Sequence, residues 1–156
     1  MPSRTSATET LQYRIADIRE LELVVPYLPE DLIKDFDERR LDYQFNFDHQ
    51  WNLEKNRFSI LVGVTYAYLS DGDAPEELLN FLGEVEFLID GLARFIDLKN
   101  KEIHFPEEFL AILTGISIST VRGMIAIRTI GKFQGRFFIP ILDPKAIVRD
   151  HLQMKA

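Results

Sequence analysis

The sequence contains no cysteine, which excludes disulfide bonds and thiolate chemistry and fits a reducing compartment. It also lacks a GxxxxGK[ST] loop and a GxGxxG turn after a strand, so we expect no nucleotide cofactor. The histidines His49, His104 and His151 do not have metal-ligand spacing, and we expect no metal site. No nucleophile, base and oxyanion donor can be assembled from the remaining motifs. The sequence therefore predicts a protein that is not an enzyme.

Positive charge and long apolar runs are also scarce. The chain has 18 Lys and Arg against 25 Asp and Glu, which gives a net charge of −7 and a pI near 5.0. Phosphate backbones would be repelled, so we expect no nucleic-acid partner. No run approaches the roughly 18 continuous apolar residues of a membrane span, and residues 1–10 lack the apolar core of a signal peptide. We therefore expect a cytoplasmic protein without membrane insertion.

Aromatic residues, in contrast, are plentiful, with 12 Phe, 5 Tyr and 1 Trp among 156 residues. Two interpretations stay open: part of the aromatic surface serves binding or assembly, or the core is simply rich in Phe. The length suits one domain with a real core and is short for two. We expect a disordered tail over residues 1–12 and a single domain over residues 13–156.

Four segments show the two-residue alternation of β-strands, at residues 18–25, 41–51, 57–69 and 79–89. The clearest is LDYQFNFDHQW at 41–51, where apolar, mostly aromatic side chains alternate with polar ones, as in a half-buried antiparallel strand. The polar residues 52–56 predict a hairpin turn. For residues 29–40 the sequence predicts either a short helix or a crossing loop. The third strand is apolar on both faces, so it lies centrally or is covered by a helix or another subunit. If another subunit covers the second face of this strand, the protein is an oligomer, and we expect one.

The pattern turns helical after Gly91. Pro106 suits a first helical position, two glutamates follow it where the helix dipole favours anions, and apolar residues then recur at spacings of three and four. Gly123 bends this helix or ends it. Asp143 followed by Pro144 predicts the N-cap and first position of a terminal helix. Four antiparallel strands followed by helices indicate an α+β fold class.

The fourth predicted strand places Leu82, Glu84 and Glu86 on one face. Two neighbouring carboxylates can act as the general acid and the general base of an enzyme. Two acids on an antiparallel strand are more often its solvated face, however, and we set catalysis aside. With Leu82 beside them, Glu84 and Glu86 form a candidate docking surface for a partner protein.

Several short motifs in a fixed order resemble the SecB family of export chaperones. FLGEV at residues 81–85 is similar to the family's Phe-Leu-Cys-Glu-Val strand. IHFP at 103–106 resembles the Ile-Leu-Phe-Pro start of its long helix, and TVRG at 120–123 resembles a Ser/Thr-x-Arg-Gly helix end. PILD at 140–143 is similar to the Ala-Pro-Val-Asn-Phe-Asp segment before the last helix. The resemblance spans residues 14–152, and the ordered set carries it rather than any one motif.

This resemblance implies a four-stranded antiparallel sheet with helices packed on one face, assembled as a homotetramer, a dimer of dimers. Family members bind unfolded or precursor polypeptides in hydrophobic grooves and pass them to the translocase motor SecA without hydrolysing nucleotide. Phe81 then matches a groove-lining position, while Glu20, Leu82 and Glu84 match motor contacts. Val24 occupies a second acidic contact position and departs from the family pattern. Some SecB-like proteins are instead dedicated antitoxin chaperones of toxin–antitoxin systems, and a diverged docking face fits that role.

Three further aromatics, Phe133, Phe137 and Phe138, lie in a glycine-flanked loop. An unfolded segment offers scattered apolar side chains, so its receptor needs adaptable aromatic surface. The three rings either supply such a surface or cap the sheet. The leading hypothesis is an ATP-independent chaperone, a holdase that delivers clients to the Sec translocase. The alternatives are a dedicated antitoxin chaperone and an oligomeric adaptor without client binding.

Overall fold

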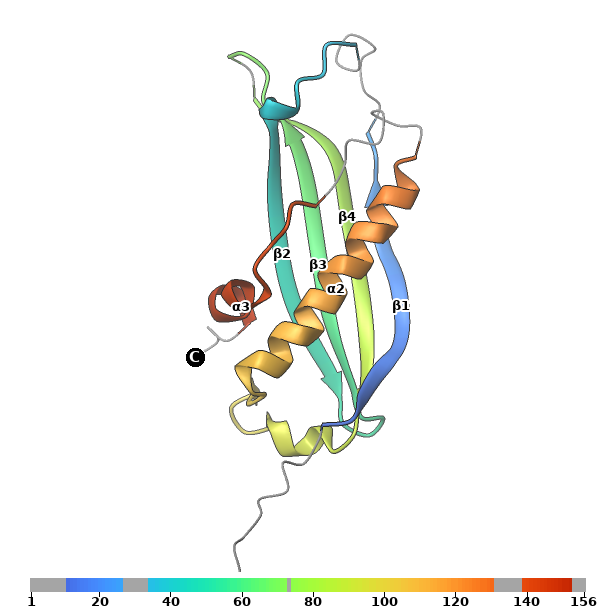
Figure 1. Cartoon of the computed structure of the whole chain (residues 1–156), viewed down its shortest axis with the longest axis vertical. Helices are drawn as coiled ribbons and strands as arrows, with labels where there is room; N and C mark the ends of the chain where they lie inside the picture. The colour runs from blue at the N-terminus through green and yellow to red at the C-terminus, as the bar shows by residue number, and fades with distance from the viewer. Residues whose placement is uncertain (1–10, 27–33, 73, 131–138, 153–156) are drawn as a thin grey trace, which may run out of the picture.

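In the computed structural model, a four-stranded antiparallel sheet is crossed by one long helix (Figure 1). The structure describes residues 11–26, 34–72, 74–130 and 139–152. The strands of the main sheet are β1 Tyr13–Val24, β2 Leu41–Asn52, β3 Arg57–Tyr68 and β4 Glu76–Ile89. The helical elements are η1 Glu38–Arg40, η2 Leu92–Phe95, α2 Glu107–Arg128, α3 Pro144–Ile147 and η4 Val148–Leu152. A small second sheet pairs β5 Ile96–Asp97 with β6 Glu102–Ile103.

The main sheet has the strand order β1-β4-β3-β2, so β1 and β2 are its two edges. β2 and β3 pair residue for residue over their whole length, and residues 53–56 form the turn between them. Asn56 ends this turn at φ 52°, a left-handed conformation that asparagine tolerates. The alternation predicted for these two strands and for β4 is confirmed, because their side chains face the expected sides.

Strand β1 differs from its prediction. It begins at Tyr13 rather than at Ile18, and its pairing with β4 shifts register twice, between Ile15 and Asp17 and between Glu20 and Glu22. Each shift is a bulge that places one extra residue on β1 and reverses which face the following side chains take.

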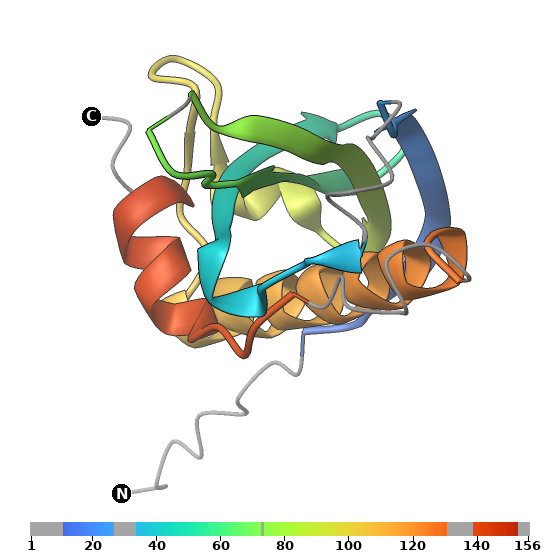
Figure 2. The ribbon, with the colours of Figure 1, turned by 90° about the horizontal axis from the view of Figure 1, so that it is seen from above.

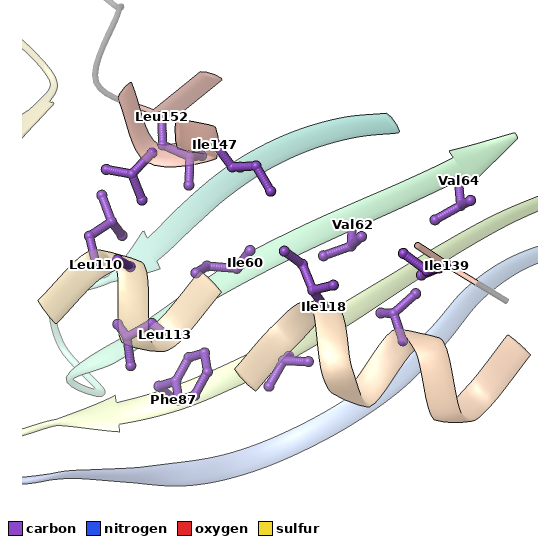
Figure 3. Close-up of a cluster of buried hydrophobic side chains, with 14 of the residues drawn as sticks. Ile60, Val62, Val64, Phe87, Leu110, Leu113, Ile118, Ile139, Ile147 and Leu152 are labelled. Carbon is purple, nitrogen blue, oxygen red and sulfur yellow. The ribbon is translucent and has the colours of Figure 1, made fainter. Parts of the chain in front are cut away.

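Helix α2 covers one face of the sheet, which we call the inner face; the opposite face is the outer face (Figure 2). Its buried side chains, including those of Leu110, Leu113 and Ile118, meet Ile60, Val62, Val64 and Phe87 of the sheet (Figure 3). The approach is close: a Cβ atom added at Gly83 of β4 would lie 2.8 Å from Cγ2 of Val121. The helix continues past Gly123 to Arg128 instead of ending there.

Strand β3 lies in the middle of the sheet, and this explains its two apolar faces. Its inner-face side chains are buried beneath the helices. On the outer face it carries small or short residues, Ser59, Gly63, Thr65 and Ala67, together with Leu61, which the neighbouring strands partly cover. The case for a second subunit therefore cannot rest on β3.

The terminal helix begins as predicted. The Asp143 carboxylate accepts a hydrogen bond from the Lys145 amide at 3.0 Å, and Pro144 takes the first helical position. Ile147, Val148 and Leu152 are buried, and η4 contacts β2. With α2 and α3 on the same face of the sheet, the predicted α+β architecture with helices on one face is confirmed (Figure 2).

Helix α2 is long and apolar enough to cross a membrane, with a mean hydropathy of 1.8 over its most apolar window. Length and composition alone do not separate a membrane span from the core helix of a folded domain. Here, 44% of that window is buried inside the protein, against the sheet and α3. Its apolar character is therefore explained in part by the core.

Candidate polypeptide-binding site

The predicted docking patch lies on the outer face of β4, but it is less exposed than expected. Leu82 and Glu86 are half-buried, and Glu84 is only 6% exposed. Arg19 of β1, which pairs directly with Glu84 across the sheet, reaches over both acids. Its guanidinium lies 3.5 Å from the Glu84 carboxylate and 3.3 Å from that of Glu86.

A wider ion-pair network surrounds this arginine. The Asp17 carboxylate accepts a hydrogen bond from Arg19 Nε at 2.7 Å, and Arg57 Nη1 lies 3.4 Å from Glu86 Oε1. The hydrogen bond from Arg19, with a second from the Ile18 amide, lowers the pKa of Asp17 below its ordinary value. The same contact raises the pKa of Arg19. The network lines a polar recess of about 260 Å³ on the outer face, where charges are already largely matched.

Glu20 lies on the opposite side of the sheet from the rest of the predicted patch. It pairs with Gly83 on the inner face, and Arg128 Nε of α2 lies 3.1 Å from its carboxylate. In a regular strand, Glu20 and Glu22 would lie on the same face of the sheet. The bulge between them places Glu20 on the inner face and Glu22 on the outer face. The first-strand acid beside Leu82 is therefore Glu22, whose Oε1 atom accepts a weak hydrogen bond from Asn80 at 3.5 Å.

The structure places Phe81 in the core. Its side chain is 0% exposed, and it lies on the inner face opposite Val64 and Leu23. Phe81 therefore does not line an open groove in this conformation. Phe133, Phe137 and Phe138 lie outside the described residues, so their predicted role in binding stays a prediction.

A row of partly exposed aromatic rings lies along β2, and we call it the β2 ladder: Tyr43, Phe45, Phe47, His49 and Trp51. Three neighbouring pairs stack, with ring centroids 6.4 Å apart for Tyr43 and Phe45, 6.4 Å for Phe45 and Phe47, and 5.8 Å for His49 and Trp51. All five side chains are half-buried on an edge strand. Partial burial raises the pKa of Tyr43, so its hydroxyl stays neutral.

The alternation at residues 41–51 predicts these rings as the apolar face of one strand. What the sequence did not reveal was the position of that strand at the edge of the sheet. A central strand would bury these rings completely, whereas this edge strand, which η4 contacts, leaves them partly exposed.

A second apolar surface lies between α2 and the start of α3. It is an open groove of about 530 Å³, lined by Ala111, Ile112, Gly115, Ile116 and Pro144 with the charged residues Glu108, Asp143 and Lys145. Ile112 is 49% exposed there. Together, the groove and the β2 ladder give the helix-covered side of the molecule open surface suited to apolar segments rather than to one small molecule.

One cluster among the described residues brings three possible metal ligands together. The ligand atoms of Asp97, Glu102 and His104 lie within 4.8 Å of one another on the β5–β6 hairpin. The Asp97 carboxylate, however, accepts hydrogen bonds from the Lys99 and Asn100 amides and from the Asn100 side chain. These bonds lower the pKa of Asp97 and stabilise the turn, which accounts for the position of this carboxylate.

The architecture places the chain in a class: a two-layer α+β protein whose antiparallel sheet carries its helices on one face. No family model and no curated protein matches the sequence. Among solved structures, the chain is similar to the SecB-like chaperone Rv1957 of Mycobacterium tuberculosis, in complex with a ChAD peptide from the HigA1 antitoxin. The match has a TM-score of 0.51 and 16% identity, and it covers 83% of this chain and 90% of that chain. The SecB-like fold predicted from the sequence is confirmed.

Proposed function

We propose that the chain is a nucleotide-independent holdase, a chaperone that binds unfolded polypeptide through apolar surface. The observation that carries this proposal is the β2 ladder, a row of aromatic rings that pack against the core on one side and stay partly exposed on an edge strand. A contiguous row of apolar side chains that stays partly open to solvent is typical of an interaction site. The chaperone of similar fold binds an antitoxin peptide, and this supports a polypeptide as the ligand.

The composition of the surface also suits an unfolded client. Such a client presents scattered apolar side chains and backbone groups rather than a fixed shape. Aromatic rings offer large contact area at a low cost in side-chain entropy. The net charge of −7 keeps a protein with exposed apolar surface soluble and favours clients that carry basic residues.

Between the two client roles, the structure favours a dedicated partner such as an antitoxin over delivery to a SecA-like motor. The predicted motor contacts are divided, because Glu20 lies on the inner face and Glu84 is buried beneath Arg19. If a motor docks on the outer face, the variant Glu22→Lys with Leu82→Ala should weaken its binding. Absence of binding between the parent protein and a purified SecA-like motor would remove the export role and leave the dedicated one.

We further propose that the chain forms a homo-oligomer through β1, with a tetramer as the expected state. β1 is an edge strand, and its apolar side chains Tyr13, Ile15, Ile18, Leu21 and Val24 are each between 40% and 45% exposed. A second copy would cover them. In an adaptor without client binding, the same surface would form the assembly and the β2 ladder would have no ligand.

The holdase proposal is tested by aggregation of a chemically unfolded protein, followed by light scattering without nucleotide. We expect the parent protein to delay aggregation, to ignore the same client once folded, and to act in moderate salt, because apolar contact carries the affinity. A Tyr43→Ser and Phe45→Ser pair should lose most of the effect, since each buried aromatic contact contributes roughly 1–2 kcal/mol.

The matched control is Gln44→Ser with Asn46→Ser, on the outer face of the same strand. This control should keep both its thermal stability and its activity. A parent protein that protects none of several clients, an antitoxin included, would contradict the proposal.

A further inference from the structure

The polar recess on the outer face is built by all four strands of the main sheet. It lies beside the turn between β2 and β3 and has a volume of about 260 Å³. This is below the roughly 300–1,000 Å³ of most small-molecule pockets, so the recess suits a ligand of few atoms rather than a polypeptide segment. Its lining includes Arg19 from β1, Trp51 from β2, Arg57 and Ser59 from β3, and Glu84 and Glu86 from β4.

Two of these side chains are buried without a hydrogen bond. Ser59 is 5% exposed and Glu84 is 6% exposed, and among the residues that the structure describes neither side chain has a hydrogen-bond partner. Arg19 Nη1 lies 3.5 Å from Glu84 Oε2, beyond the roughly 2.7–2.9 Å of a charge-assisted hydrogen bond. The hydrogen bonds that Arg19 Nη2 and Arg57 Nη1 donate go to Glu86 instead. Buried polar groups almost always have a partner, so Ser59 and Glu84 need one from solution.

The ion-pair network around the recess also carries one negative charge in excess. Its three carboxylates are those of Asp17, Glu84 and Glu86. Only two guanidinium groups contact them, those of Arg19 and Arg57. A water molecule could donate a hydrogen bond to Glu84, but it would leave the excess charge in place. A cation with N–H groups would supply both the missing hydrogen bonds and the balancing charge, in a position where charges interact more strongly than in bulk water.

We propose that the recess binds a small organic cation that carries a guanidinium or primary ammonium group. The N–H groups of the cation donate hydrogen bonds to the Glu84 carboxylate and to the Ser59 hydroxyl. The ring of Trp51, which also lines the recess, attracts the positive charge through its π-electrons. Apart from Trp51, this site shares no residue with the β2 ladder, and it does not depend on client binding.

Trp51 provides the readout, because it is the single tryptophan of the chain and lines the recess. Methylguanidinium and butylammonium are titrated separately at constant ionic strength, and the tryptophan fluorescence is followed. We expect a saturable change with at least one of them. Tetramethylammonium is the control: it has the same charge but no N–H group, so it should bind about tenfold more weakly or worse. The absence of a saturable change with both probes, or an equal response to tetramethylammonium, would overturn the proposal.

Substitutions on the outer face separate the recess from the rest of the β2 ladder. Glu84→Gln removes the charge that balances the cation and should weaken binding about tenfold or more. Ser59→Ala removes one hydrogen bond, and the expected loss of affinity is roughly three- to tenfold. A cation that stacks elsewhere on the ladder would also change the fluorescence of Trp51, but its affinity would depend on neither residue. Unchanged affinity in both variants would therefore contradict the proposed site.

The matched control for charge is Glu77→Gln. Glu77 is an exposed acid on the outer face of the same strand, and its replacement changes the net charge by the same amount. This control should bind the cation as the parent protein does, and an equal loss in Glu77→Gln and Glu84→Gln would show that net charge alone attracts the cation. Melting temperatures verify that each variant is folded. If Glu84→Gln unfolds, Ser59→Ala decides, because it keeps every ion pair of the network; affinity equal to that of the parent would then refute the site.

Discussion

The two edges of the sheet are built differently. β1 shifts register twice and presents apolar side chains, while ionic and aromatic contacts join it to the rest of the fold. Arg19 reaches acids on β4, Glu20 pairs with Arg128 of α2, and the Tyr13 ring contacts Phe109 at 5.1 Å. β2 shows an unbroken register and carries the aromatic ladder, in which three neighbouring pairs of rings stack.

If the two proposals hold, the difference separates two associations on one sheet, assembly at β1 and client binding at β2. A bulged edge is a poor template for an arbitrary strand, so β1 suits a specific partner such as another copy. A regular strand lined by aromatic rings offers a continuous apolar row to an extended polypeptide segment, so β2 suits the proposed client. A substitution at one edge should therefore leave the other edge unchanged, whereas a substitution in the shared core should affect both.

The largest effect is expected from Phe81→Ala, which removes a fully buried ring from the core that both edges share. We expect a loss of about 3–5 kcal/mol in the free energy of unfolding, measured by denaturant titration. Client capture and assembly should fail together. Leu98→Ala, at a 66% exposed position, is the control and should change stability by less than about 0.5 kcal/mol. A stable Phe81→Ala variant that loses client binding alone would instead make this ring part of the binding surface.

Arg19→Ala should loosen β1 and leave β2 intact. It removes the guanidinium from the buried Glu84 carboxylate, and an unsatisfied buried acceptor costs about 1–3 kcal/mol. Adding Glu84→Gln should recover part of this loss. Arg39→Ala, which breaks an exposed pair with Asp37, is the control and should have little effect. Faster amide exchange in β2 than in β1 would refute the assignment of the network to β1.

Charges placed on β1 should change assembly more than stability. Ile18→Lys with Leu21→Lys introduces repulsion at positions that are 44% and 45% exposed in one chain. We expect the oligomer to dissociate while the melting temperature of the subunit changes little, as measured by size exclusion with light scattering. An unchanged mass, or a parent protein that is already monomeric at micromolar concentration, would argue against β1 as the interface.

The smallest effect concerns pH. The pKa of Asp17 is lowered from an ordinary value of 3.8 by its hydrogen bond to Arg19, so the folded state binds the proton more weakly than the unfolded state. The contribution to stability is therefore complete above 3.8 and disappears as pH falls through the lower folded pKa. The stability difference between the parent and Asp17→Asn should vanish over that interval. A difference that grows on acidification would contradict the assigned direction.

Much of this fold could be predicted because its signals are local. The alternation at residues 41–51 and the Asp143 cap each reflect the chemistry of a few neighbouring residues, and both are confirmed. The bulges of β1 leave no comparable signal, because one extra residue changes the facing of a strand without changing its composition. The helix runs through Gly123 because an interior glycine costs only about 1 kcal/mol, which tertiary packing outweighs.

The candidate site was less predictable because it depends on contacts between distant residues. Glu84 is buried because Arg19, far away in the sequence, lies across it. Glu20 and Glu22 look equivalent in the sequence, and only the register with β4 separates their faces. The β2 ladder was recognised as an apolar face, but its exposure depends on the strand order, which no single segment encodes.

Residue-resolved amide hydrogen exchange, with and without a bound unfolded client, tests the central claim most directly. The account predicts that client binding slows exchange at the odd-numbered residues of β2, which carry the ladder, and leaves β1 unchanged. Amides of even-numbered β2 residues should change less, because the hydrogen bond from the Leu69 amide to the Arg40 carbonyl oxygen makes the even-numbered residues those that bond to β3. Protection confined to β1, or no protection anywhere along β2 in a complex that forms, would contradict the assignment of the client to this edge.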